Sequence, residues 1–108
     1  MFTINGEYWR VLFVSPNHIS LLKPNMEFAI GACDDYSKTI YLSGDLRGDQ
    51  LKRVLCHEIT HAAMFSYNVS LSLAQEELIA ELMATFGEEI IDITNILFDY
   101  LKRKGRFY

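Results

Sequence analysis

The chain divides into a first half of short apolar runs broken by turn residues and a second half with apolar residues at helical spacing. Residues 2–14 form two runs around Asn5-Gly6, a dipeptide that favours the tight turn of a β-hairpin. Residues 28–33 and 38–42 form a second pair of runs. Gly31 lies within the first of these, and a glycine in a strand often marks a close approach by another group. This pattern predicts a small antiparallel sheet.

Helical spacing begins in the middle of the chain. Asp49 can cap a helix that runs to about Tyr67, with an apolar stripe for the core. A second helix is expected from Ser72, since Ser72 and Gln75 have the spacing of a capping box. Gly87 interrupts this segment, which therefore forms either two helices or one kinked helix. The expected stripe of the first helix comprises Leu51, Val54, Leu55, Ile59, Ala62 and Phe65.

Length and composition are those of one folded domain, residues 1–108. Half of the residues are hydrophobic, which is enough for a modest core and argues against disorder. No internal repeat or linker divides the chain. We therefore predict an α+β fold in which a small antiparallel sheet packs on a central helix and one or two further helices.

Charge and cysteine content narrow the classes of function. The formal net charge of −4 argues against a general nucleic-acid-binding protein, and the basic cluster Lys102-Arg103-Lys104 suits the negative end of a helix dipole. Two cysteines without a Cys-x-x-Cys pair favour a reducing compartment. The chain opens without a secretory signal, and no apolar run reaches the roughly 18–20 residues of a membrane span. We expect a soluble cytoplasmic protein that binds neither nucleic acid nor membrane.

The stretch Cys56–Met64 contains the pattern H-E-x-x-H within the first predicted helix. Side chains four residues apart share one helix face, so His57 and His61 can direct two imidazole nitrogens at one point. Glu58 lies beside that point. Two nitrogen ligands and an adjacent carboxylate that takes a proton from water are what a hydrolytic zinc site requires. The alternative is a pair of ordinary helix histidines, one in the core and one at the surface.

A third zinc ligand is expected, because catalytic sites usually have three from the protein. His18 is the remaining histidine, and the second predicted helix carries Glu76, Glu77 and Glu81. Glu77 and Glu81 share a helix face, whereas Glu76 lies on a different side. A zinc ion bound by one of the paired carboxylates, with the other orienting a histidine, would relieve their repulsion. The short connection 66–71 should fold this helix back beside the histidines. The alternative is two solvent-facing acids near a helix start.

Four stretches form a wider pattern: Cys33-Asp34, Thr39–Leu42, His57–His61 and Glu77-x-x-Ala80-Glu81. Together they resemble the gluzincin-type zincins, and in particular the short, prophage-associated ImmA/IrrE-like metallopeptidases. In that family the third ligand is a glutamate three residues before an alanine on the helix after H-E-x-x-H, which implies Glu77. The family often has Asn or Asp after this alanine. This chain has Glu81 there, which leaves the role of that side chain open.

The resemblance implies a minimal zincin-like fold and zinc-dependent cleavage of peptide bonds in a protein substrate. We predict that Zn²⁺ binds to His57, His61 and Glu77, and that Glu58 is the catalytic base. Larger members often act on a helix-turn-helix repressor of a prophage or a stress response. Because this chain has no helix-turn-helix of its own, such a regulator would be a separate partner.

Other residues have candidate supporting roles. Residues 38–42 are the expected edge strand, where an extended substrate would pair. We expect both cysteines, Cys33 and Cys56, to be buried thiols and Asp34 to be a turn residue. Cys33 could instead approach the metal from the sheet. Four side chains are candidates for stabilising the oxyanion of peptide hydrolysis, namely His18, Tyr36, Tyr41 and Tyr67.

Three alternatives remain open at the level of sequence. The first is a catalytically silent zincin-fold module that keeps zinc and binds a regulatory or phage protein; the intact Glu58 weighs against it. The second is structural zinc, with His18 or a cysteine as a fourth ligand. The third is a latent peptidase whose own tail, residues 102–108, lies in the cleft.

Overall fold

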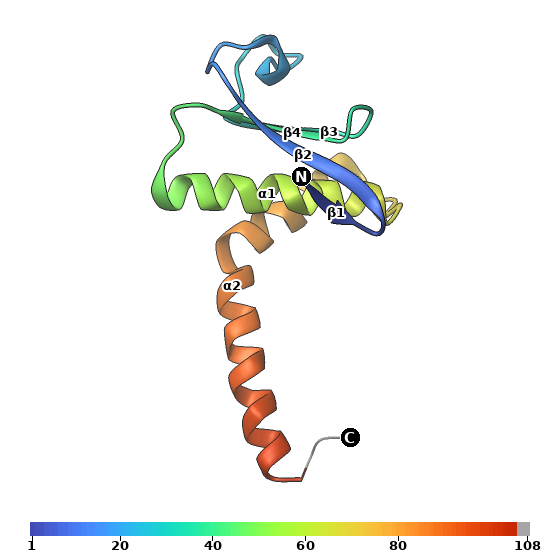
Figure 1. Cartoon of the computed structure of the whole chain (residues 1–108), viewed down its shortest axis with the longest axis vertical. Coiled ribbons are helices and arrows are strands. Elements are labelled where there is room, and N and C mark those ends of the chain that lie inside the picture. Colours follow the sequence, from blue (N-terminus) through green and yellow to red (C-terminus); the bar gives the residue numbers. More distant parts are fainter. Residues whose placement is uncertain (106–108) are drawn as a thin grey trace.

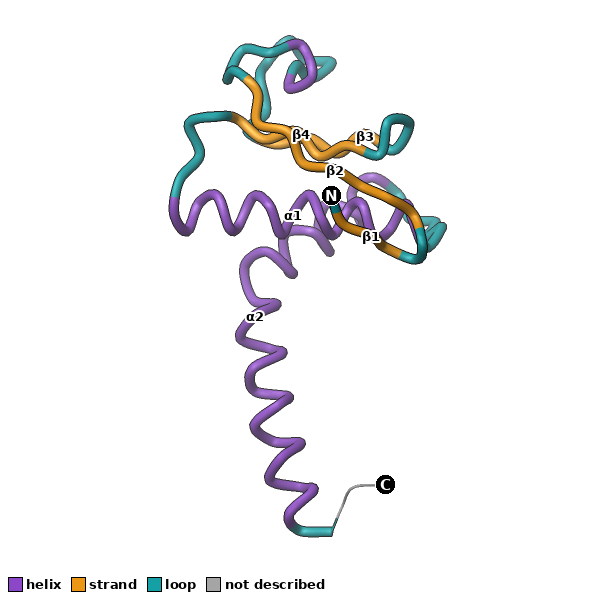
Figure 2. Tube along the Cα trace, viewed as in Figure 1, coloured by secondary structure: helices purple, strands orange, loops and turns teal. Residues whose placement is uncertain are grey.

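The computed structural model describes residues 1–105 and has an α+β architecture of a four-stranded sheet and two helices. Figures 1 and 2 show the sheet on one side of the first helix and the second helix leaving the other side. No helix in this part of the chain is long and apolar enough to cross a membrane. The elements in chain order are β1 (Phe2–Ile4), β2 (Glu7–Val14), the 3₁₀ turn η1 (Ile19–Leu21), β3 (Gly31–Asp34), β4 (Thr39–Ser43), α1 (Gly48–Ser66) and α2 (Leu73–Arg103).

The sheet has the strand order β1-β2-β4-β3 and is mixed. The predicted hairpin is present, with Asn5 and Gly6 at positive φ in its turn and β1 antiparallel to β2. β3 and β4 are also antiparallel, as predicted. β4 runs parallel to β2, however, so the expectation of an antiparallel sheet is wrong for this pair. The long connection through η1 joins the end of β2 to the start of β3 at the same end of the sheet, and β4 then inserts between these two strands.

This strand order also corrects the expected substrate edge. Residues 39–43 form an interior strand with partners on both sides. The edge strand next to β4 is β3, which pairs with β4 alone. Alternating apolar residues indicate which face of a strand is buried, but they do not say which strand lies at the edge.

The hydrophobic core lies between the sheet and α1. Trp9, Ile40, Leu42 and Ala62 are fully buried there. The indole Nε1 of Trp9 donates a hydrogen bond of 2.8 Å to Oγ of Ser66 at the end of α1. The hairpin is therefore fixed to the helix that carries H-E-x-x-H, and the sheet and this helix form one rigid unit.

α2 is one continuous helix. The predicted capping box is present, since Oγ of Ser72 accepts from the amide of Gln75 and the Gln75 side chain accepts from the amide of Ser72. The first half of α2 packs on α1 through the buried residues Ala80 and Gly87, whereas the second half projects away from the domain (Figure 1). Asp49, expected to cap α1, lies in its first turn, and the N-cap is Arg47.

Candidate metal centre

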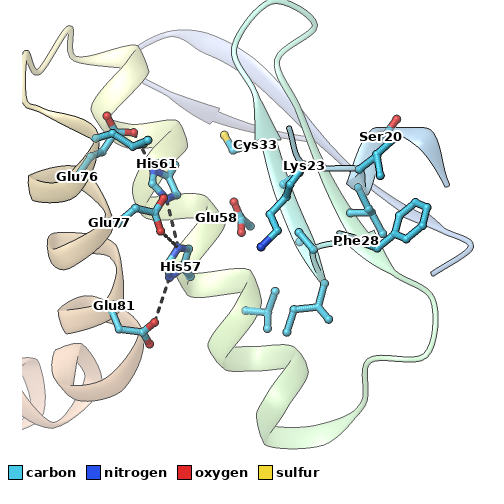
Figure 3. A pocket seen from close by; sticks show the side chains of 18 of the residues that line it. Ser20, Lys23, Phe28, Cys33, His57, Glu58, His61, Glu76, Glu77 and Glu81 are labelled. Carbon is cyan, nitrogen blue, oxygen red and sulfur yellow. Dashed lines mark hydrogen bonds and ion pairs between the residues drawn. The ribbon is translucent and has the colours of Figure 1, made fainter. Parts of the chain in front are cut away.

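A cavity of about 850 Å³ opens between α1, the start of α2, β3 and the loop around residues 20–30. His57, Glu58 and His61 line it from α1, and Glu77 lines it from α2 (Figure 3). The four-residue spacing on α1 directs both imidazoles to the α2 side, while Glu58, one residue after His57, is turned toward β3. The H-E-x-x-H motif thus forms one wall of a cavity.

Three side chains of this wall bring ligand atoms together. Nε2 of His57 and Nε2 of His61 lie 3.2 Å apart. The Glu77 carboxylate lies 3.2 Å from the first and 2.8 Å from the second. A tetrahedral metal ion with bonds of about 2.0–2.1 Å holds neighbouring ligand atoms about 3.3 Å apart. The two separations of 3.2 Å agree with that geometry, whereas the 2.8 Å contact is shorter and involves the other carboxylate oxygen. This group could hold a metal ion.

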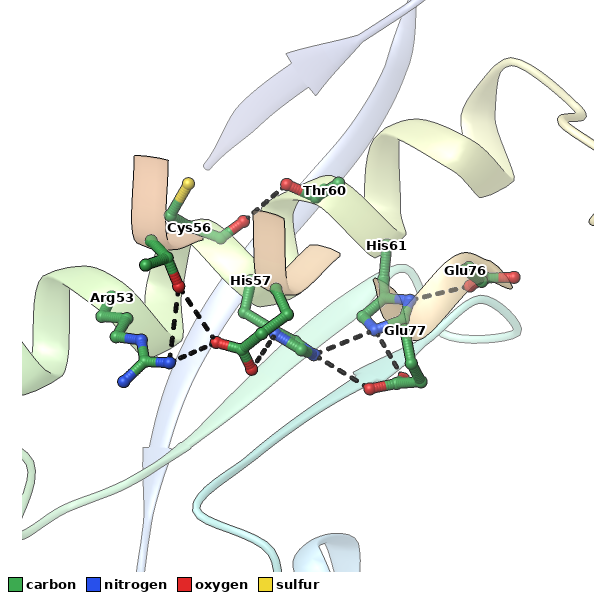
Figure 4. A network of polar contacts seen from close by, with 9 residues as sticks. Arg53, Cys56, His57, Thr60, His61, Glu76 and Glu77 are labelled. Carbon is green, nitrogen blue, oxygen red and sulfur yellow. Dashed lines mark hydrogen bonds and ion pairs between the residues drawn. The ribbon is translucent and has the colours of Figure 1, made fainter. Parts of the chain in front are cut away.

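Two further glutamates of α2, Glu76 and Glu81, lie beside the histidines (Figure 3), and Figure 4 shows the polar contacts of this region. Nδ1 of His61 lies 2.7 Å from Oε1 of Glu76. With its hydrogen on Nδ1, the imidazole would donate a hydrogen bond to this carboxylate and keep the lone pair of Nε2 for a metal. Nδ1 of His57 lies 3.8 Å from Oε2 of Glu81, which forms an ion pair with Arg53. Glu76 thus fixes the tautomer of one ligand, while Glu81 lies farther from the other and has a cation of its own.

Glu58 lies in the cavity but outside the three-ligand group. Its side chain is buried, and this burial raises the pKa of the carboxyl from 4.5 to about 7, with Glu77 contributing in the same direction and His61 opposing it. A carboxyl with a pKa near neutrality can both accept and return a proton. Glu58 is therefore a buried titratable group beside the three-ligand group and not part of it.

Gly31 of β3 makes the approach of Glu58 to the sheet possible. A Cβ at this position would lie 2.7 Å from Cγ1 of Val54 and 3.0 Å from Oε2 of Glu58. Gly31 is thus a point of close approach between α1 and the edge strand, one of the two roles, with a bulge, that a glycine in a strand often has.

Comparisons with models of protein families, with curated proteins and with solved structures gave no match. The cavity and the residues that form it are therefore the features from which a function can be inferred.

Several expected supporting residues lie elsewhere. His18 caps η1 by accepting a hydrogen bond from the amide of Ser20, and neither it nor Tyr36, Tyr41 or Tyr67 lines the cavity. Cys33 does line the cavity, but it lies outside the three-ligand group found among residues 1–105. Burial and the nearby Glu58 raise the pKa of its thiol, which disfavours the thiolate that a metal would need.

Glu76 contacts a candidate ligand, although helix spacing assigns the role of orienting a histidine to Glu77 or Glu81. Glu76 reaches Nδ1 of His61, whereas Glu77 reaches Nε2 of the same ring. The two carboxylates flank the small residue Ala80, which is fully buried against α1. A small residue four positions after Glu76 was the available signal, because it lets α1 and α2 approach closely enough for both carboxylates to reach α1.

Proposed function

We propose that the protein is a zinc-dependent metallopeptidase, a minimal gluzincin related to the ImmA/IrrE-like enzymes. The observation that carries this proposal is the position of Glu58: a buried carboxyl beside the three-ligand group, in the same cavity, and not part of that group. A site that only binds a metal for stability has no use for such a group. Burying a carboxyl without a partner is costly, so its presence supports a catalytic role.

Zinc is the metal that best fits the donor set. Two imidazoles and one carboxylate suit zinc, and three protein ligands leave a fourth position for water. His18 and both cysteines lie outside the ligand group in the described chain, which weighs against structural zinc with four protein ligands. When bound, zinc would polarise a water molecule and the carbonyl of a peptide bond.

The chain's own residues then perform the proton transfers. Glu58 takes a proton from the attacking water and later delivers it to the amine that leaves when the peptide bond breaks. Glu76 keeps His61 in the tautomer that presents Nε2, and Arg53 holds Glu81 beside His57. The positions of these groups are set by the packing of α2 on α1, so little rearrangement is needed before reaction.

The substrate is a protein or peptide in an extended conformation. The cavity extends along β3, an edge strand that can add a further strand through main-chain hydrogen bonds. The lining beyond the metal group is mostly apolar, with Leu22, Phe28 and Ile30 on the loop and strand side. Lys23 extends into this space from the loop (Figure 3) and supplies a cation on the substrate side.

A regulator of a prophage or of a stress response, present as a separate chain, is the substrate class that the resemblance favours. Cys33 and Cys56 are both free thiols, which supports a reducing compartment such as the cytoplasm.

The test is cleavage of a mixed peptide library by zinc-loaded protein, followed by mass spectrometry. We expect cleavage that a chelator abolishes, that zinc restores and that Glu58→Gln removes while zinc stays bound. Cleavage by Glu58→Gln at the wild-type rate would exclude the assigned base. Stoichiometric zinc without cleavage of the library or of the host's proteins would instead favour a silent zinc-binding module.

A further inference from the structure

The second half of α2 is an unusually apolar surface. Every described residue from 88 to 105 is exposed. After the ion pair of Glu88 with Lys52 of α1, this segment projects away from the domain (Figure 1). A monomeric protein rarely exposes so large a contiguous apolar area. Eight large hydrophobic side chains of this segment are between 43% and 68% exposed, namely Ile90, Ile91, Ile93, Ile96, Leu97, Phe98, Tyr100 and Leu101.

The apolar residues follow the spacing of a helix that packs against another helix. Ile90, Ile93, Leu97 and Tyr100 are separated by three, four and three residues. This is the a/d pattern of a coiled coil, in which such a seam faces a partner helix. Leu101 borders the seam, and Ile91 lies farther around the helix. We call Ile90, Ile93, Leu97 and Tyr100 the tail seam.

The charges beside the tail seam indicate what covers it. Glu89, Ile96 and Arg103 are spaced seven residues apart, so they lie on one flank of the seam. The flank has an acid at one end, a base at the other and an apolar residue at the midpoint. All three side chains are exposed. The charges of this flank are complementary to those of a second copy of the helix that runs antiparallel to it.

We propose that the tail seam is the interface of an antiparallel homodimer, with a two-fold axis beside Ile96. Ile90 then packs with Tyr100 of the second copy and Ile93 with Leu97, in an isologous arrangement that repeats across the axis. Glu89 of each chain lies beside Arg103 of the other. The paired segment spans about 21 Å of helix, and each globular part lies beyond the end of the other chain's helix.

The orientation follows from the same charges. In a parallel pair of coiled-coil helices, Glu89 would face Thr94 of its partner and no charge pair would form. Only the end-to-end arrangement joins the acid of one flank with the base of the other. The proposal does not depend on the catalytic assignment, because no residue of the tail seam lines the cavity.

Sedimentation equilibrium of the full chain measures this association. We expect a reversible dimer for the wild type and a monomer for Ile93→Glu, which places a charge in the tail seam. Asn95→Glu is the matched control, because Asn95 points away from the seam, and it should remain dimeric. A wild-type chain that stays monomeric up to about 0.1 mM would overturn the proposal.

Charge exchange tests the orientation independently of the fold. Glu89→Arg and Arg103→Glu should each weaken self-association roughly ten-fold, since each turns both ion pairs into repulsions. An equimolar mixture of the two variants should associate as a heterodimer, because their flanks are again complementary. Circular dichroism of each variant confirms that α2 is intact. Unchanged association of the single variants would contradict the antiparallel seam, and so would the absence of a heterodimer in the mixture. A tail seam that binds another protein and not a second copy of this chain would also contradict it.

Discussion

Nδ1 of His61 lies 2.7 Å from Oε1 of Glu76, and this contact joins α1 to α2 directly behind the candidate metal group. Both side chains are mostly buried, at 8% and 16% exposure. A buried carboxylate on Nδ1 fixes which nitrogen of the imidazole carries hydrogen and makes the other a better ligand. The packing of the two helices and the chemistry of the site therefore depend on one another.

Removal of the Glu76 carboxylate should weaken metal binding without removing a ligand. We expect Glu76→Ala to lower zinc affinity about 10–100-fold and Glu76→Gln to lower it less, because the amide oxygen still accepts from Nδ1. Competition with a chromophoric chelator measures this effect. Asp99→Asn, at the far end of α2, is the matched control and should bind zinc as the wild type does.

Replacement of Glu77 should have a larger effect than replacement of Glu76. Glu77 supplies the third candidate ligand, with its Oε2 3.2 Å from Nε2 of His57 and its Oε1 2.8 Å from Nε2 of His61. Its loss leaves two imidazoles and an incomplete site, so we expect Glu77→Ala to reduce zinc affinity more than 100-fold, or about 3 kcal/mol or more. Equal losses in the Glu76→Ala and Glu77→Ala variants would reject Glu77 as the ligand.

The close approach at Gly31 predicts a packing defect. Gly31→Ala adds a methyl group 2.7 Å from Val54 and 3.0 Å from Glu58, and should destabilise the fold by about 1–3 kcal/mol. Urea denaturation measures this loss. Val54→Ala removes the nearer contact, so the double variant should be more stable than the sum of the single effects predicts. Strict additivity would show that Val54 is not the obstacle.

The pKa of Glu58 makes the stability of the metal-free protein depend on pH. The carboxyl has a pKa of about 7 in the folded chain against an ordinary value of 4.5, so between these values the folded chain binds the proton more tightly than the unfolded chain. Stability should therefore fall as pH rises from about 4.5 to 7, by up to about 3 kcal/mol from this group.

Comparison with Glu58→Gln isolates this contribution. The glutamine cannot ionise. With a chelator present to keep the protein metal-free, the wild type should therefore lose more stability than the variant between pH 5 and pH 7, a range that lies between the two pKa values of Glu58. Parallel stability curves for the two proteins would show that Glu58 titrates near its ordinary pKa.

The sequence predicted the parts of the fold that depend on local chemistry. The Asn5-Gly6 turn, the Ser72–Gln75 capping box and the start and end of α1 to within about two residues all follow from short-range preferences. The three ligand residues were predicted from helix spacing together with the family resemblance, and the structure brings them into one group.

The sequence did not predict features that depend on how distant segments meet. The connection through η1 places β3 at the edge and leaves the position beside β2 for β4, which therefore pairs with β2 in parallel. No local pattern encodes this arrangement. Gly87 did not break α2, because its lack of a side chain fits the close packing beside Met83 and α1. The contact of Glu76 with His61 was not predicted, since helix spacing alone does not give the angle at which α2 crosses α1.

The proposed zinc site, with Glu77 as a ligand and Glu58 beside it, is tested by the zinc content of three purified proteins: the wild type, Glu58→Gln and Glu77→Ala. The account predicts one zinc per chain in the wild type and in Glu58→Gln, and little in Glu77→Ala, because Glu58 lies beside the metal group and Glu77 belongs to it. Equal zinc in all three proteins, or none in the wild type after zinc is supplied, would contradict it.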